Sequence, residues 1–168
     1  MRLSVTRRKA GALITGAAIG SAEGAATAMG QGAGLSTNVR IFNAIIERGF
    51  NQGDLSIADE VCAAKLSEHE YLAKTNVPGP EILKDQIQTA RGNLKGLTLT
   101  VEDLVENGDK VWARSTCTGT DSGTGKPITM TVIDICRFEN GKLVEHWGVP
   151  DRFAVLHQIG ALPPRPKQ

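Results

Sequence analysis

The chain has 168 residues, of which 19 are basic and 18 acidic, so its formal net charge is only +1. A chain of this length suits one domain with a real hydrophobic core and room for an internal ligand cavity. The small net charge supplies no field that would gather phosphates, so the composition argues against nucleic-acid binding.

The first 28 residues differ in composition from the rest and look like an export signal. A basic start with the pair Arg7-Arg8 precedes a weakly apolar run over 10–22, and Ala26-Thr27-Ala28 has the small-x-small pattern of a signal-peptidase site. This resembles a twin-arginine signal cleaved after Ala28, which predicts a periplasmic or extracellular protein. The alternative is an extension without a targeting role, which would leave the protein cytoplasmic. The apolar run is too short for a membrane span, and we expect no integral membrane segment in the mature chain.

The rest of the chain divides into a flexible linker, a folded domain and a polar tail, expected at residues 29–35, 36–162 and 163–168. In the first half of the domain, apolar residues recur at helical spacing, which predicts three helices. The first is capped by Ser36 or Thr37, the second follows Asp54, and Pro78-Gly79-Pro80 introduces the third. A short strand or extended segment is expected around 65–72, between the second and third helices.

From Leu97 onward the apolar period changes from near 3.6 to 2, which predicts antiparallel strands. We expect these strands over residues 97–105, 111–118, 127–138 and 142–149. Asn107-Gly108-Asp109 and Asn140-Gly141 mark the first and last turns between them. Helices followed by an antiparallel meander define an α+β class, in which a curved sheet wrapped by the N-terminal helices would enclose a ligand site.

The last hairpin and the segment after it have the most specific pattern in the chain. It reads Arg-Phe-x-x-Gly-Lys-Leu-Val-Glu-x-Trp from Arg137 to Trp147, then Asp151 and a closing Leu-x-Gln-Ile-Gly over 156–160. This closely resembles the SnoaL-like polyketide cyclase (ester cyclase) group of the nuclear-transport-factor-2-like superfamily. The resemblance implies a cone-shaped fold, a small apolar or polyketide-like ligand, and a homodimer formed through the open face of the sheet. It implies the reaction less closely, because this architecture hosts isomerases, hydrolases, cyclases and non-catalytic binders.

Asp134 is the first candidate for chemistry, because it lies between Val132 and Cys136 on an apolar face of its strand. A buried carboxylate must be hydrogen-bonded, paired or protonated, since burying a bare charge is unfavourable. In a structural interpretation, Asp134 is tied to Arg114 or to another cross-strand donor. In a functional one, its buried setting suits it to general acid or base work.

Two histidines and a second aspartate are further candidates for proton transfer. His146 titrates near neutral pH and could exchange a proton with a substrate, or it could be a half-buried hydrogen-bonding residue. His69 lies in a segment that resembles the family's early strand, where a histidine often faces the cavity. Asp151 could support the site, or it could simply cap the closing helix.

Four large side chains are predicted to wall the cavity and bind the substrate: Phe42, Trp112, Met130 and Trp147. Trp147 has an alternative role in the core. Aromatic residues make up only 4% of the chain, so the two tryptophans are among few side chains able to form such a wall.

The chain departs from the family pattern at Gly148. Many members of the group have an aspartate directly after the last-strand tryptophan, the residue proposed as acid and base in their ring closure. Without a side chain there, proton transfer would have to pass to Asp134, His146 or Asp151. Two hypotheses therefore stand: a cofactor-independent cyclase, isomerase or hydrolase, and a non-catalytic ligand-binding or dimerisation module.

The cysteines and histidines predict neither a cofactor nor a metal site. Cys62, Cys117 and Cys136 show no ligand spacing and are expected as buried small hydrophobes, with a Cys117–Cys136 disulfide as the alternative. The three histidines are far apart in the sequence, and none pairs with another at ligand spacing.

Overall fold

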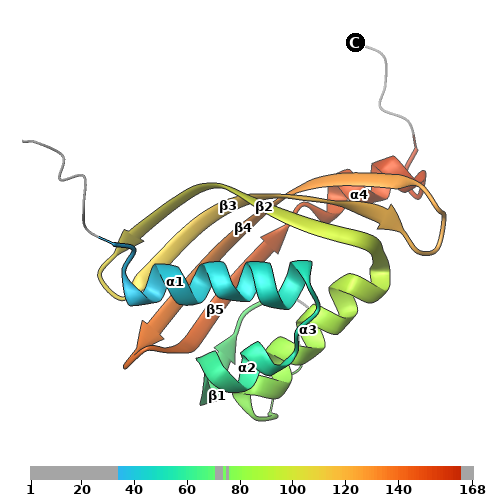
Figure 1. The fold of residues 1–168 in the computed structure, drawn as a ribbon. Coiled ribbons are helices and arrows are strands. Elements are labelled where there is room, and N and C mark those ends of the chain that lie inside the picture. The colour runs from blue at the N-terminus through green and yellow to red at the C-terminus, as the bar shows by residue number, and fades with distance from the viewer. Residues whose placement is uncertain (1–33, 71–73, 75, 164–168) are drawn as a thin grey trace, which may run out of the picture. The chain divides into compact units, whose positions relative to one another are not determined.

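The computed structural model describes residues 34–163, apart from 71–73 and 75, and one compact unit begins at Gly34 (Figure 1). The predicted export signal and nearly all of the predicted linker fall before Gly34 and lie outside the described residues, as do 164–168 of the predicted tail. Among the described helices, none combines the length and the apolar composition that a membrane crossing requires.

The described unit is an α+β fold of five helical elements and a five-stranded sheet. The helical elements are α1 (Thr37–Ala44), η1 (Ile45–Asn51), α2 (Ser56–Val61), α3 (Gly79–Asn93) and α4 (Arg152–Ile159). The strands are β1 (Cys62–Glu68), β2 (Leu94–Asn107), β3 (Lys110–Asp121), β4 (Pro127–Glu139) and β5 (Lys142–Pro150). The predicted fold class, with a curved sheet against which the N-terminal helices pack, is therefore confirmed (Figure 1).

The sheet has the strand order β1-β5-β4-β3-β2, and β2 to β5 form the expected antiparallel meander. Strand β1 pairs with β5 in parallel, so the sheet is mixed rather than wholly antiparallel. The tight turn between β4 and β5 follows from its sequence, since Asn140 and Gly141 have φ angles of 50° and 71°. Both angles are positive, as a type I′ hairpin turn requires.

The helices begin and end where their sequences dictate. The Ser36 hydroxyl caps α1 by accepting a bond from the Val39 N–H at 3.1 Å, and α3 begins with a proline in its first turn. The first helix continues as the π-helical η1. There, the Asn51 side chain accepts from the Leu99 N–H at 2.7 Å and donates to the Leu99 C=O at 3.1 Å, which fixes the helix to β2.

The closing helix α4 is held by its own motif residues. Asp151 caps its start by accepting from the Ala154 N–H at 2.9 Å, and Gly160, with a φ of 84°, ends it. The Gln158 side chain bonds the Thr129 N–H and C=O at 2.9 and 2.7 Å, which ties α4 to β4.

The three cysteines are free and buried, as expected for small hydrophobes. The alternative disulfide is excluded by register, because Cys117 lies opposite Met130 while Cys136 lies opposite Val111. Six positions along a strand correspond to about 20 Å, far beyond the reach of a disulfide. Burial raises the pKa of Cys62 to about 12 and that of Cys117 to about 11, so neither thiol is a ready nucleophile at neutral pH.

Candidate functional site

A cavity of about 520 Å³ lies between the sheet and the helices. Much of its wall is apolar and comes from α1, η1, α3 and the inner face of the sheet, including Phe42, Ile46, Phe50, Leu83, Met130 and Val132. Its polar lining includes Glu70, Gln86, Asp134, His146 and Arg152. An apolar pocket with a few convergent polar groups is the usual form of a small-molecule site.

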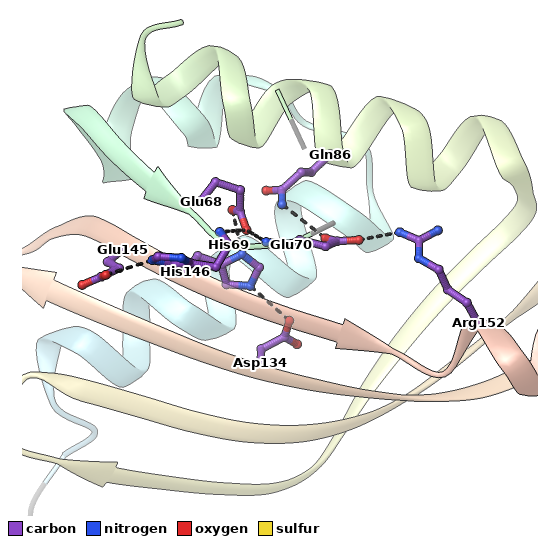
Figure 2. Close-up of polar contacts among 8 residues, drawn as sticks. All are labelled: Glu68, His69, Glu70, Gln86, Asp134, Glu145, His146 and Arg152. Atoms are coloured by element: carbon purple, nitrogen blue, oxygen red, sulfur yellow. Dashed lines mark hydrogen bonds and ion pairs between the residues drawn. The ribbon is translucent and has the colours of Figure 1, made fainter. Parts of the chain in front are cut away.

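His146 lies between two carboxylates from two other strands (Figure 2). Its Nδ1 is 2.8 Å from Glu68 Oε2 of β1, and its Nε2 is 3.2 Å from Asp134 Oδ1 of β4. The His146 and Asp134 side chains are each 13% exposed and that of Glu68 is fully buried. Asp134 and His146 line the cavity, so the Glu68–His146–Asp134 cluster presents one of its carboxylates to a ligand.

The surroundings of His146 favour its charged form. Burial by itself would lower its pKa, but the hydrogen bonds and charges of Asp134 and Glu68 outweigh burial and raise the pKa to about 10. Burial would raise the pKa of Glu68, yet its contacts with His146 and with the Glu70 N–H bring that pKa below its ordinary value. At neutral pH the ring is therefore an imidazolium that donates from both nitrogens.

Glu68 also shapes the backbone that follows β1. Its Oε1 accepts from the N–H groups of His69 and Glu70 at 2.9 and 2.8 Å, while its Oε2 is bound to His146. One carboxylate thus orients the imidazolium and fixes the turn that places Glu70. Sequence reasoning missed Glu68; the available signal was strand alternation, which puts it on the same face as the buried Leu66, two residues earlier.

Glu70 is a second carboxylate on the cavity wall, and it too was missed from the sequence. Its Oε1 accepts from Arg152 Nη2 at 2.5 Å, and its Oε2 accepts from Gln86 Nε2 at 3.3 Å (Figure 2). Arg152 of α4 and Gln86 of α3 thereby hold the carboxylate of Glu70, which follows the edge strand β1. All three residues line the cavity.

Gly148 lies directly opposite Asp134 in the β4–β5 register. A Cβ atom at this position would lie 2.9 Å from His146 Cε1 and 3.2 Å from Glu70 Oε2. The space that a side chain at position 148 would need is therefore shared by the His146 ring and the Glu70 carboxylate. Without a side chain, the glycine lets both groups approach this part of the cavity.

The structure brings two of the four predicted catalytic residues together, Asp134 and His146. The donor for Asp134 is His146 and not Arg114, which pairs with Asp103 at 2.5 Å, so the Arg114 alternative is corrected. Asp151 caps α4, as its structural interpretation proposed.

His69 is placed differently from its prediction, because it lies outside the lining of the cavity. Its ring stacks on Trp147 with centroids 4.7 Å apart, and its Nε2 is 3.0 Å from Glu145 Oε1. Glu145 is also bound to Arg137 Nε at 2.7 Å. We call His69, Trp147, Glu145 and Arg137 the outer cluster.

Of the four predicted wall residues, Phe42 and Met130 line the cavity while Trp112 and Trp147 do not. On β3 the buried residues are Val111, Ala113, Ser115 and Cys117, so Trp112 projects from the other face and is 44% exposed. Trp147 follows the inward-facing His146 and therefore projects to the side of the outer cluster. Both tryptophans therefore project from the face of their strand that is turned away from the cavity, and not into the cavity as predicted.

Within the described part of the chain, no group of three or more histidine, cysteine or acidic side chains is arranged to hold a metal ion. The acidic groups around His146 and Arg152 instead pair with these two residues. Their chemistry is that of carboxylates and an imidazolium acting on a ligand in a largely apolar space.

Comparison with known proteins places this geometry in context. Residues 40–159 match the family model of the SnoaL-like polyketide cyclases. Among solved structures, TsrD from Streptomyces laurentii is 26% identical with a TM-score of 0.67, and the match covers 75% of this chain and 96% of TsrD. IdmH from Streptomyces antibioticus, a proposed polyketide cyclase, is 28% identical with a TM-score of 0.63, covering 74% of this chain and 99% of IdmH. No protein of curated function matches the chain in sequence.

Proposed function

Because the chain belongs to the SnoaL-like polyketide cyclase family, we propose that it is a cofactor-independent enzyme that transfers protons on a small, largely apolar substrate. The observation that supports this proposal is the Glu68–His146–Asp134 cluster at the wall of a mostly apolar cavity. A fixed carboxylate beside a buried cation is a typical arrangement for general acid and base chemistry.

In this proposal Asp134 is the base. It takes a proton from a carbon next to a substrate carbonyl; the C–H electron pair becomes the new C=C bond and the carbonyl electrons move to oxygen. Asp134 is then neutral, and the positive His146, whose Nε2 is 3.2 Å from Asp134 Oδ1, faces the new negative charge. The enolate then closes a ring by aldol addition and the new alkoxide takes the proton back from Asp134, or, in an isomerase, Asp134 returns the proton to another carbon of the enolate.

Glu68 is a positioning residue in this scheme. Its bond to His146 Nδ1 at 2.8 Å fixes the ring so that Nε2 points to Asp134. Its negative charge also helps to keep the ring protonated, as the raised pKa of about 10 for His146 indicates.

Hydrogen exchange tests the proposal without knowledge of the natural substrate. β-Tetralone, a small apolar ketone with acidic α-hydrogens, is incubated in heavy water with the protein, and the loss of its α-hydrogen signal is followed by NMR. We expect the protein to accelerate exchange, and Asp134→Asn to lower the enzymatic rate by at least about 100-fold. Asparagine can still accept from His146, so we expect the variant to fold.

The matched control is Asp103→Asn, which alters a carboxylate of similar chemistry that is paired with Arg114 and does not line the cavity. Its exchange rate should equal that of the wild type. Equal rates for Asp134→Asn and the wild type would remove Asp134 as the base and end this proposal.

A non-catalytic ligand-binding module is the second candidate, and Gly148 favours it because the family's usual aspartate is missing there. The same probe separates the two functions. Calorimetric binding of β-tetralone without any accelerated exchange would support the binding module and contradict the enzyme.

Export and dimerisation are proposals that rest on the sequence. A mature N-terminus at Met29 on secreted protein would support the twin-arginine signal, whereas an intact Met1 on secreted protein would contradict it.

For the homodimer, the outer face of the sheet supplies Val105, Trp112 and Ile133, which are 60%, 44% and 37% exposed. Sedimentation of wild type and Trp112→Glu would test whether this face joins two copies.

A further inference from the structure

The pair Glu70–Arg152 forms a polar patch on the cavity wall that the proton-transfer scheme does not use. Both residues line the cavity, and they are joined by the 2.5 Å contact between Arg152 Nη2 and Glu70 Oε1. The Glu70 side chain is 21% exposed and that of Arg152 is 56% exposed. The pair is therefore closer to solvent than Asp134 and His146, whose side chains are each 13% exposed.

The position of Glu70 is fixed from three directions. Gln86 of α3 donates to its Oε2, Arg152 of α4 donates to its Oε1, and the Glu68 carboxylate accepts from its backbone N–H at 2.8 Å. Its Oε2 also lies 3.2 Å from the point where a Cβ at position 148 would be, and the His146 ring touches that same point. The carboxylate is thus held beside the Glu68–His146–Asp134 cluster.

Both partners of the pair keep hydrogen-bonding capacity for a ligand. A carboxylate has about four lone-pair sites, of which Arg152 and Gln86 use two. A guanidinium has five N–H groups, and Glu70 accepts from one of them. The patch can therefore accept a hydrogen bond from a ligand and donate one to it.

The charges of the pair select the kind of ligand group. A ligand carboxylate near Arg152 would be repelled by Glu70, and an ammonium near Glu70 would be repelled by Arg152. A hydroxyl avoids both penalties, because it donates to the carboxylate and accepts from the guanidinium. We propose that Glu70 and Arg152 form a subsite for a neutral hydroxyl group, so that the substrate is an apolar carbonyl compound that also carries a hydroxyl. This inference rests on the proposed function for the carbonyl part of the substrate.

Ligand discrimination tests the subsite independently of catalysis. Dissociation constants are measured by calorimetry for β-tetralone and for its isomers with one hydroxyl on the aromatic ring. We expect at least one hydroxylated isomer to bind the wild type about tenfold more tightly than β-tetralone does. Glu70→Ala should bring this ratio close to one, and Arg152→Met should lower it severalfold.

Asp103→Asn is again the matched control, since it disrupts an arginine–carboxylate pair away from the cavity and should leave the ratio unchanged. Equal binding of all the isomers and β-tetralone by the wild type would overturn the inference. So would stronger binding of a ring-carboxylated analogue, which would indicate an anion site on Arg152.

The outcomes also separate this inference from the proposed function. A hydroxyl preference that depends on Glu70, in a protein that does not accelerate exchange, would contradict the enzyme and support the subsite. Normal exchange that requires Asp134, without any hydroxyl preference, would support the enzyme and overturn the subsite.

Discussion

Two histidines near the same edge of the sheet lie on its opposite faces, and the face decides what each side chain can do. His146 and His69 both contact a carboxylate, at 2.8 Å from Glu68 and 3.0 Å from Glu145. The His146 side chain is 13% exposed and lies between two acids, whereas that of His69 is 43% exposed and stacks on Trp147. Because two carboxylates flank its buried ring, His146 stays protonated at neutral pH on the cavity wall. His69 packs on Trp147 on the opposite face.

The parallel pairing of β1 with β5 produces this difference. Glu68 is paired with His146 in the register, and the His69 N–H donates to the His146 C=O at 3.0 Å. Because side chains alternate between faces, Glu68 and His146 point into the fold while His69, Glu145 and Trp147 meet outside it. The inner Glu68–His146–Asp134 cluster and the outer cluster should therefore respond differently to substitution.

The largest difference in stability between the two clusters is expected when each histidine loses the glutamate that contacts it. Glu68→Ala leaves a buried imidazolium with one carboxylate partner and the Glu70 N–H without its acceptor, whereas the His69 N–H keeps its bond to the His146 C=O. The free energy of unfolding should fall by about 3–5 kcal/mol. Glu145→Ala removes a partly exposed partner, and its effect should not exceed about 1 kcal/mol. Urea denaturation of both variants measures the two values. Similar losses would mean that the inner cluster is no more important to the fold than the outer one.

The pH dependence of stability should come from the inner histidine. Folded His146 keeps its proton up to pH about 10, whereas a histidine in the unfolded chain releases it near 6.5. The folded state therefore binds more protons between these values, so this contribution is complete below pH 6.5 and is lost as the pH rises toward 10. The slope should reach at most about 1.4 kcal/mol per pH unit.

Urea denaturation at several values from pH 6 upward, with wild type and His146→Gln, measures this slope. The substitution should flatten the curve, and Glu145→Gln should leave it as in the wild type. An identical slope in His146→Gln would assign the proton uptake to another group.

The sequence predicted those features that depend on neighbouring residues. The Asn140-Gly141 turn, the Ser36 cap and the helix after Pro78 each follow from the chemistry of a few adjacent positions. The same holds for the strand periods and for the Asp151 cap of α4. These local signals, with the motif of the last hairpin, were sufficient for the α+β class and for the approximate strand limits.

The site was harder to predict because its contacts are distant in the chain. Glu68 and His146 are 78 residues apart, and only the parallel pairing of an edge strand brings them together. Trp112 was misplaced because β3 has apolar residues on both faces, Val111 on one and Trp112 on the other. Alternation separates the two faces of such a strand without indicating which one is buried.

A smaller effect is expected at Gly148, where the inner cluster depends on the absence of a side chain. The Cβ of Gly148→Ala would lie 2.9 Å from His146 Cε1, so the ring must shift against its two hydrogen bonds. We expect a loss of about 1–3 kcal/mol in the free energy of unfolding and a slower exchange of β-tetralone. Gly92→Ala in α3 is the control, since its Cβ meets nothing within 4 Å and alanine should stabilise the helix by up to about 1 kcal/mol. Normal exchange in Gly148→Ala would contradict the need for this position of the ring.

The smallest effect is expected at His69, and it tests the contrast between the two clusters most directly. His69→Gln removes the stack on Trp147 and alters the bond to Glu145, both at a partly exposed position, so the free energy of unfolding should fall by about 1 kcal/mol or less. The exchange rate and the affinity for β-tetralone should equal those of the wild type, because the ring lies outside the cavity. A large loss of exchange with an unchanged free energy of unfolding would show that the outer histidine takes part in the chemistry. Only that result would give the two faces a shared function, since the two faces of the sheet separate the reactive imidazolium of His146 from His69, which packs on Trp147.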